Sequence, residues 1–230
     1  MRAVPPVALV RQVDTHRLVP SRHSAGGDSV LMRIADDDEH LRAVFELDAA
    51  TNDRLLAEHQ RFAGIGVEEM VFGVPCSHVV NAAFCHPHPL GGRFNGPDRG
   101  AWYAGFALQT AQAEVAFHKS VELAEVGWTA EESITCDDYL ADFSAAFHDL
   151  RRAAGFRACL DPRSYVSSQA LAVRLLDAES LGVVYPSVRH AGGTCLACFR
   201  PPLVTNVRRD ATYRFTFSGT AAPAIVRETA

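Results

Sequence analysis

Two glycine pairs constrain the fold of this chain more than any other feature, because each stands beside segments with strand character. Gly192-Gly193 separates two apolar runs, Val183–Val188 and Thr194–Phe199, and Gly91-Gly92 precedes a third, Ala101–Phe106. Glycine permits the backbone conformations that tight turns need. The sequence therefore predicts short strands connected by glycine-rich turns, with the first two strands joined through Gly192-Gly193.

Two other segments have helical periodicity. Apolar residues recur at helical spacing across Gln109–Leu123, where Thr110 is a candidate cap, and Ser167-Ser168 opens a second helix with Gly182 just past its end. The remaining strand and turn signals comprise Val7–Val13, an extended His16–Arg22, the region from Val71 that includes Val79–Phe84, a mixture of strand and loop over Ile134–Phe147, and Tyr213–Phe217. Mixed strands with few long helices favour an α+β fold over a doubly wound parallel sheet.

The chain length of 230 residues suits one domain, with or without an added N-terminal lobe. Helical spacing over Asp36–Phe62 predicts such a lobe. We expect a single domain over 1–230, with a helical elaboration at about 30–70 and a core at about 71–218.

Composition and charge restrict the classes of partner. The formal net charge is −5, so we expect no direct binding to nucleic acid, which requires a cationic surface. Pro5 and Pro6 interrupt the N-terminal apolar residues, and no apolar run approaches the roughly 18 residues of a membrane span. These features predict a soluble, cytoplasmic protein without membrane contact.

Six cysteines are scattered along the chain, and one pair has CxxC spacing, Cys195 and Cys198. The pair lies in an apolar run that has strand character, where an odd offset sends the two side chains to opposite faces. The sequence therefore indicates reduced, partly buried thiols and no zinc or redox pair.

Three side chains in consecutive segments form the main candidate catalytic site. Arg93 lies on a glycine-rich turn, Tyr103 on the next strand, and Glu114 in the following helix among apolar neighbours. An arginine fork matches phosphate oxygens, an aromatic ring can stack on a nicotinamide, and a carboxylate stabilises an oxocarbenium-like sugar. The alternatives are an exposed arginine of an ordinary hairpin and a solvated helix carboxylate.

Ser187 follows a strand but lacks the Gly-x-Ser-x-Gly pattern of a hydrolase nucleophile. Its hydroxyl can hydrogen-bond a ligand or a catalytic carboxylate, or it can cap the strand end. A rival metal site would combine His86 and His88 with Glu114 and His118, which are spaced i, i+4 on one helix. The HExxH motif of metalloproteases is absent, so we expect no metal.

The chain resembles the RES domain family, which is named for an arginine, a glutamate and a serine. The matching segments are His16–Arg22, Ala50–Leu55, Gly92-Arg93-Phe94, Tyr103-Ala104, Ala113-Glu114, Tyr165–Ala170, Val184–Arg189 and Gly192–Cys195. This ordered set is far more specific than any single motif.

The resemblance implies a fold similar to ADP-ribosyltransferases, with a split mixed or antiparallel sheet around an NAD cleft and extra N-terminal helices. Arg93 would then bind the NAD phosphates, Tyr103 would face the nicotinamide, Glu114 would serve the ribose, and Ser187 would complete the pocket floor. Phe94 stands where some relatives carry tyrosine or tryptophan, so it keeps an aromatic surface without the polar group. Arg22 and Arg189 are further candidates for phosphate contact.

Members of this family are NAD-consuming toxins of bacterial toxin–antitoxin pairs. The resemblance implies that the chain cleaves the nicotinamide–ribose bond of NAD, with water, phosphate or a protein side chain as acceptor of ADP-ribose. It also implies an Xre-like antitoxin that covers the NAD cleft. Protein mono-ADP-ribosylation as the main activity, a non-catalytic nucleotide-binding module and the metal-dependent hydrolase are the alternatives.

Overall fold

The computed structural model describes residues 4–24, 64–219 and 222–229. The helical segment predicted at Asp36–Phe62 lies outside the described residues, as does most of the predicted elaboration at about 30–70. The division of the chain at about residue 70 stays a prediction.

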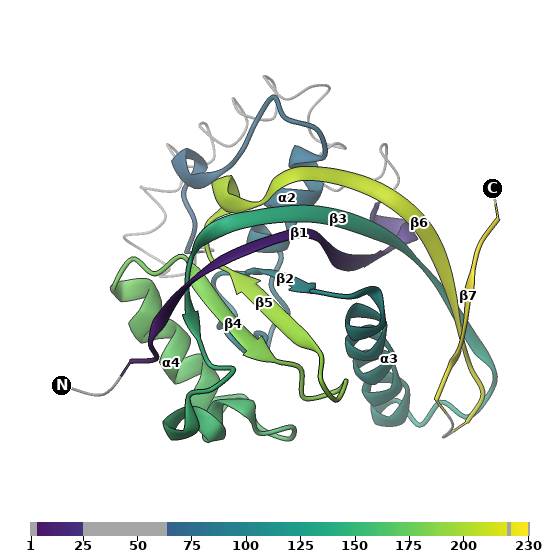
Figure 1. The fold of residues 1–230 in the computed structure, drawn as a ribbon. Helices are drawn as coiled ribbons and strands as arrows, with labels where there is room; N and C mark the ends of the chain where they lie inside the picture. The colour runs from purple at the N-terminus through teal and green to yellow at the C-terminus, as the bar shows by residue number, and fades with distance from the viewer. Residues whose placement is uncertain (1–3, 25–63, 220–221, 230) are drawn as a thin grey trace, which may run out of the picture.

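A mixed sheet forms the body of the protein (Figure 1). Its strands are β1 (Val7–Pro20), β2 (Trp102–Gly105), β3 (Glu132–Asp149), β4 (Gly182–Pro186), β5 (Thr194–Cys198), β6 (Thr205–Phe217) and β7 (Ala224–Arg227). They lie in the order β1-β2-β5-β4-β3-β6-β7, and β1 also pairs with β3. Strands β3 and β4 run parallel and the other pairs in the described chain are antiparallel. The α+β prediction with a mixed sheet is therefore confirmed.

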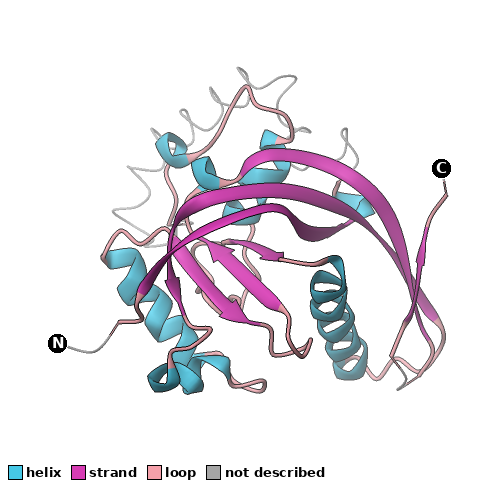
Figure 2. Ribbon diagram, viewed as in Figure 1, coloured by secondary structure: helices cyan, strands magenta, loops and turns pink. Residues whose placement is uncertain are grey.

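Strand β1 closes part of this sheet into a ring. It pairs with β3 along most of its length and with β2 at His16–Gly105. The long strands β1, β3 and β6 arch over the short strands β2, β5 and β4 (Figure 2). Between the two layers lies the first core, which includes Val10, Trp102, Phe143 and Leu196.

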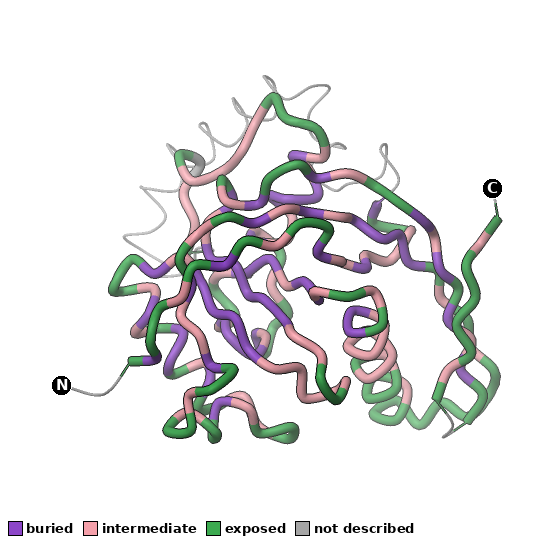
Figure 3. Tube along the Cα trace, viewed as in Figure 1, coloured by how far each residue is buried: buried purple, intermediate pink, exposed green. Residues whose placement is uncertain are grey.

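Three α-helices flank the sheet within the described residues: α2 (Ser77–Cys85), α3 (Leu108–Glu125) and α4 (Val166–Asp177). Short 3-10 turns occupy η1 (Ser21–His23), η2 (Val67–Glu69), η3 (Ala154–Leu160) and η4 (Pro201–Leu203). Helix α4 packs Leu171 and Leu175 against Val183 and Ala197 of β4 and β5 in a second core. Most residues of these two strands are buried (Figure 3). Helix α3 contributes Ala111 to a third core. None of the described helices is long and apolar enough to span a membrane.

Several predicted elements are confirmed. The strand predicted at Ala101–Phe106 is β2, and the strands joined through Gly192-Gly193 are the antiparallel pair β4 and β5. The two predicted helices are α3 and α4. Cys195 belongs to the second core and Cys198 to the first, so the two thiols face opposite sides of β5 as predicted.

The segment Val79–Phe84, which lies among the strand and turn signals, is helical. It falls within α2, where Val79, Val80 and Phe84 are buried together with Asn81. Asn81 accepts a hydrogen bond from Val71 N (3.1 Å) and donates one to Val71 O (2.8 Å). The Asn81 side chain thus supplies hydrogen-bond partners for the backbone of the segment before the helix. A contact between these two segments cannot be predicted from the local spacing of apolar residues.

The mixture of strand and loop over Ile134–Phe147 is also wrong, because β3 is one continuous strand. Asp137 and Asp138 lie within this strand, where both carboxylates are buried and hydrogen-bonded. Thr110 does not cap α3: the N-cap is Ala107, and Thr110 is buried inside the first turn. Strand β7 has no counterpart among the sequence predictions.

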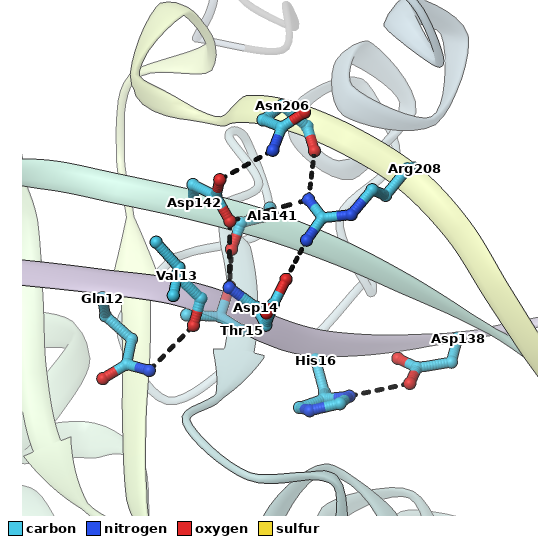
Figure 4. Close-up of polar contacts among 10 residues, drawn as sticks. All are labelled: Gln12, Val13, Asp14, Thr15, His16, Asp138, Ala141, Asp142, Asn206 and Arg208. Atoms are coloured by element: carbon cyan, nitrogen blue, oxygen red, sulfur yellow. Dashed lines mark hydrogen bonds and ion pairs between the residues drawn. The ribbon is translucent and has the colours of Figure 1, made fainter.

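A bulge in β1 determines which side chains face α3. Asp14 has a positive φ of 52°, and the register with β3 shifts there. Asp142 accepts from Asp14 N (2.9 Å), and Arg208 forms ion pairs with both carboxylates (Figure 4). The extra residue reverses the alternation of the strand. Val10 faces the first core before the bulge, whereas His16 lies on the face of Leu18, toward α3.

The packing of α4 gives a test of the second core. Leu171 is fully buried, whereas Val173 on the same helix is 55% exposed. Leu171→Ala leaves a cavity, so it should lower the free energy of unfolding by about 2–5 kcal/mol. Val173→Ala should change it by less than about 0.5 kcal/mol. Urea unfolding measures both, and equal effects would contradict the packing described here.

Candidate active site

A cleft of about 1,680 Å³ opens between β1, the Gly91–Asn95 turn and α3. It brings together most of the residues that the sequence singles out. Those on its lining include Arg17, Arg22, Arg93, Tyr103, Glu114 and Arg189.

The Gly91–Asn95 turn is fastened to β2 by the hydroxyl of Tyr103. This hydroxyl donates to Asn95 Oδ1 (2.8 Å) and accepts from Phe94 N (2.8 Å). Gly91 has a φ of 72°, and a Cβ there would collide with Asn95 O, so glycine is required. Burial raises the pKa of Tyr103 well above its usual range. The hydroxyl therefore stays protonated and holds the turn in place.

Arg93 is buried at the side of the cleft, with 6% of its surface exposed. Its Nη1 donates to the carbonyl oxygens of Cys159 (3.1 Å) and Asp161 (2.8 Å), and its guanidinium lies 4.7 Å from the centre of the Tyr165 ring. No carboxylate of the described residues forms an ion pair with it. The positive charge is therefore fixed in place without an anionic partner from this part of the chain.

Phe94 does not line the cleft. It is fully buried, and its ring packs 4.8 Å from that of Tyr185 in the second core. The structure thus places this predicted cofactor contact behind the turn, where it supports Arg93 from the protein interior.

Arg17 is a second cation of the cleft, although no sequence motif singled it out as a site residue. Its guanidinium lies 4.9 Å from the Trp102 ring and donates to Tyr103 O (3.2 Å). Its Nε is buried without a hydrogen-bond partner, and burial lowers its pKa to about 10. Long cationic side chains are rarely buried without a partner. The position of Arg17 inside a segment with strand character was therefore the sequence signal that could have identified it as a site residue.

Glu114 is held at the opposite wall by Ser187. The Ser187 hydroxyl accepts from the backbone nitrogens of Arg189 (3.1 Å) and His190 (3.0 Å) and donates to Glu114 Oε1 (2.8 Å). Cys195 Sγ lies 3.7 Å from the same oxygen. Burial, with Glu114 nearby, raises the pKa of Cys195 to about 12, so this thiol remains protonated. The two backbone donors orient the hydroxyl toward the carboxylate.

The other predicted cations lie along the same cleft. The Arg189 guanidinium stacks 3.2 Å from the centre of the Phe117 ring, and its Nη2 donates to Pro162 O (2.6 Å). Arg22 is exposed in η1, where its Nε contacts His23. Burial lowers the pKa of His118, against the opposing effect of Glu114.

The rival metal site does not form in the described part of the chain. No three His, Cys, Asp or Glu side chains there are grouped so that they could hold a metal ion. His86, His88, Glu114 and His118 therefore do not assemble into the site that their spacing allowed.

Residues 71–218 match the family model of the RES domain. The match covers well over half of the chain, which therefore belongs to the RES domain family. A chain in the crystal structure of the M. tuberculosis MbcT–MbcA toxin–antitoxin complex is similar, with 14% identity and a TM-score of 0.46 over 91% of this chain and 87% of that chain. No curated protein matches the sequence.

The contacts of Tyr103 can be tested by removing one oxygen. Tyr103→Phe leaves Phe94 N and Asn95 Oδ1 without this partner, so the free energy of unfolding should fall by about 1–3 kcal/mol. The matched control is Tyr165→Phe, because the Tyr165 hydroxyl forms no hydrogen bond with a described residue; it should cost less than about 0.5 kcal/mol. Chemical denaturation measures both, and a harmless Tyr103→Phe would show that the turn does not depend on this hydroxyl.

Proposed function

We propose that this chain is the toxin of a bacterial toxin–antitoxin pair and that it cleaves NAD at the nicotinamide–ribose bond. The chain belongs to the RES family, whose members are NAD-consuming toxins. Its resemblance to that family, in the segments quoted above, implies a fold similar to ADP-ribosyltransferases. The arch of β1, β3 and β6 over β2, β5 and β4 would be the split sheet of such a fold, with NAD in the cleft beside it.

One observation carries the proposal. A carboxylate fixed by a serine, Glu114 with Ser187 (2.8 Å), shares a cleft with Arg17 and Arg93. Neither arginine forms an ion pair with a carboxylate of the described residues. NAD offers what each group requires: a diphosphate for the guanidinium groups, which recognise phosphate oxygens in pairs, and a sugar that becomes cationic during cleavage.

The bond between nicotinamide and ribose breaks with its electron pair moving to the ring nitrogen of nicotinamide. The ribose C1′ then develops oxocarbenium character, and a fixed carboxylate lowers the free energy of that state. Glu114 fills this role in the proposal. Ser187 positions it, because its hydroxyl already accepts two backbone donors and its own proton is directed at Glu114 Oε1.

Tyr103 has a double role in the proposal. Its hydroxyl fastens the turn that carries Arg93, and its ring, on the cleft lining, faces the nicotinamide side. Arg22 and Arg189 lie where they could contact the phosphates or the adenosine portion. Phe94 supports the turn from behind and makes no contact with the nucleotide.

The acceptor of ADP-ribose is water, inorganic phosphate or a protein side chain, because all three require the same cleavage of NAD. Protein mono-ADP-ribosylation is the alternative main activity. Incubation with NAD, with and without phosphate and cell lysate, separates these cases by the masses of the products: free ADP-ribose, its phosphorylated form or a modified protein.

The proposed partner is an Xre-like antitoxin whose terminal segment covers the cleft. The cleft contains the buried Arg93 and the half-buried Arg17, although the whole chain is acidic, with a formal net charge of −5. An acidic side chain or terminal carboxylate of the antitoxin could take the place of the nucleotide phosphates. Binding of the complex to DNA would then depend on the antitoxin, not on this chain.

Glu114→Gln tests the proposed chemistry. The amide keeps the shape of the side chain but loses its charge, so the turnover of NAD should fall by ~10²–10³ while the protein stays folded. Glu179→Gln is the matched control, since Glu179 is exposed just after α4 and lies outside the cleft lining; its activity should match that of the wild type.

Mass spectrometry of the nucleotide pool and growth of expressing cells give the two readouts. Near-wild-type NAD consumption by folded Glu114→Gln protein would remove the carboxylate from the mechanism. Recovery of unchanged NAD from the wild-type protein would instead favour a non-catalytic binding module.

A further inference from the structure

A histidine–aspartate pair joins β1 to β3 at the edge of the cleft. His16 Nδ1 lies 2.7 Å from Asp138 Oδ2, and Figure 4 shows the pair apart from the network of Asp14, Asp142 and Arg208. The Asp138 side chain is fully buried, and its Oδ1 has no hydrogen-bond partner. Among the described residues, His16 is the side chain that pairs with this carboxylate. The charge of Asp138 therefore acts mainly on one imidazole ring.

The bulge at Asp14 places this ring on the cleft side of β1. His16 keeps 19% of its side chain exposed and belongs to the cleft lining. Its backbone pairs with Gly105 of β2, which pairs in turn with Cys195 of β5. Cys195 Sγ lies 3.7 Å from Glu114 Oε1. His16, Gly105 and Cys195 thus lie side by side on three neighbouring strands. The last of them contacts Glu114, the proposed catalytic carboxylate.

The hydrogen bond to Asp138 determines what His16 can do. A carboxylate that accepts from Nδ1–H fixes the ring orientation and the tautomer, and it leaves Nε2 as the nitrogen that can take up a proton. No group of the described residues hydrogen-bonds to Nε2. The pair therefore has the arrangement of a general base with its orienting carboxylate.

We propose that His16, oriented by Asp138, takes the proton from the acceptor that captures the ADP-ribosyl group. This inference rests on the proposed cleavage of NAD. Nicotinamide leaves with the electron pair of the C1′–N bond. A lone pair of the acceptor oxygen forms the new C1′–O bond, and the proton of that oxygen moves to His16 Nε2 and then to solvent. Asp138 acts as a positioning residue, because the described hydrogen bond of its side chain is to His16.

His16→Asn is the decisive variant. The amide nitrogen of asparagine can replace Nδ1 as a donor to Asp138, while nothing replaces Nε2. With water as acceptor, NAD turnover should fall by ~10²-fold or more, and the affinity for ADP-ribose should change by less than about threefold. His148→Asn is the matched control, because His148 also uses Nδ1 for a hydrogen bond, to Pro5 O (2.8 Å), but lies outside the cleft lining.

Azide distinguishes a general base from a residue that only supports the structure, because a structural defect in His16→Asn would not be restored by azide. It is an anionic nucleophile without a proton to lose, so it should restore turnover in His16→Asn and yield ADP-ribosyl azide. It should not rescue Glu114→Gln, which lacks the cation-stabilising charge. Asp138→Asn should lower the rate with water and leave the rate with azide near that of the wild type.

Wild-type protein alone decides the question if the variants do not fold. Its rate with water should fall in deuterium oxide, because the proton of the acceptor moves to His16 as the new bond forms, whereas its rate with azide should not change. Equal effects of deuterium oxide for the two acceptors, or a fully active His16→Asn protein, would overturn the role of His16 alone. Absence of NAD turnover by the wild type would overturn the proposed function and this inference with it.

Discussion

The pairing of β1 on both of its edges is the constraint on which the rest of the structure depends. On one edge β1 follows β3 for most of its length, and at His16 the other edge meets Gly105 of β2. The ring that results sets β2 and β5 under the long strands and opens the cleft beside α3. The same short stretch of β1 supplies His16 and Arg17 to that cleft. The strand pairing that closes the sheet therefore also positions these two side chains at the site.

Uncompensated charge then distinguishes the cleft from the rest of the interior. Asp137 is buried, but Thr212 and Arg209 satisfy it. Arg93 and Arg17 have carbonyl and aromatic neighbours and no carboxylate partner among the described residues. A buried cation without an anion is unfavourable until a ligand supplies one. A nucleotide diphosphate or an antitoxin carboxylate would supply one, which explains how one site could serve both catalysis and inhibition.

Local sequence patterns predicted the elements that have a clear turn or apolar spacing of their own. The β4–β5 hairpin, β2, α3 and α4 follow from glycine turns and apolar spacing. The RES motifs singled out Arg93, Tyr103 and Glu114, which line one cleft, and Ser187, which hydrogen-bonds to Glu114. Contacts between distant segments were not accessible in this way. Asn81 hydrogen-bonds the backbone of Val71, which lies before helix α2. The hydrogen bonds of the buried Asp137 and Asp138 allow β3 to continue without a break. The bulge at Asp14 reverses which side chains of β1 face each side of the sheet. For that reason Arg17 and the His16–Asp138 pair emerged only from the structure.

The central claim is that one cleft binds NAD through Arg17 and Arg93 and presents its ribose to Glu114. The most direct measurement is a crystal structure of the Glu114→Gln protein with NAD. The account predicts the diphosphate within hydrogen-bond distance of Arg17 or Arg93, and the nicotinamide ribose beside residue 114. NAD bound outside this cleft, or bound with its adenine end at residue 114, would contradict it.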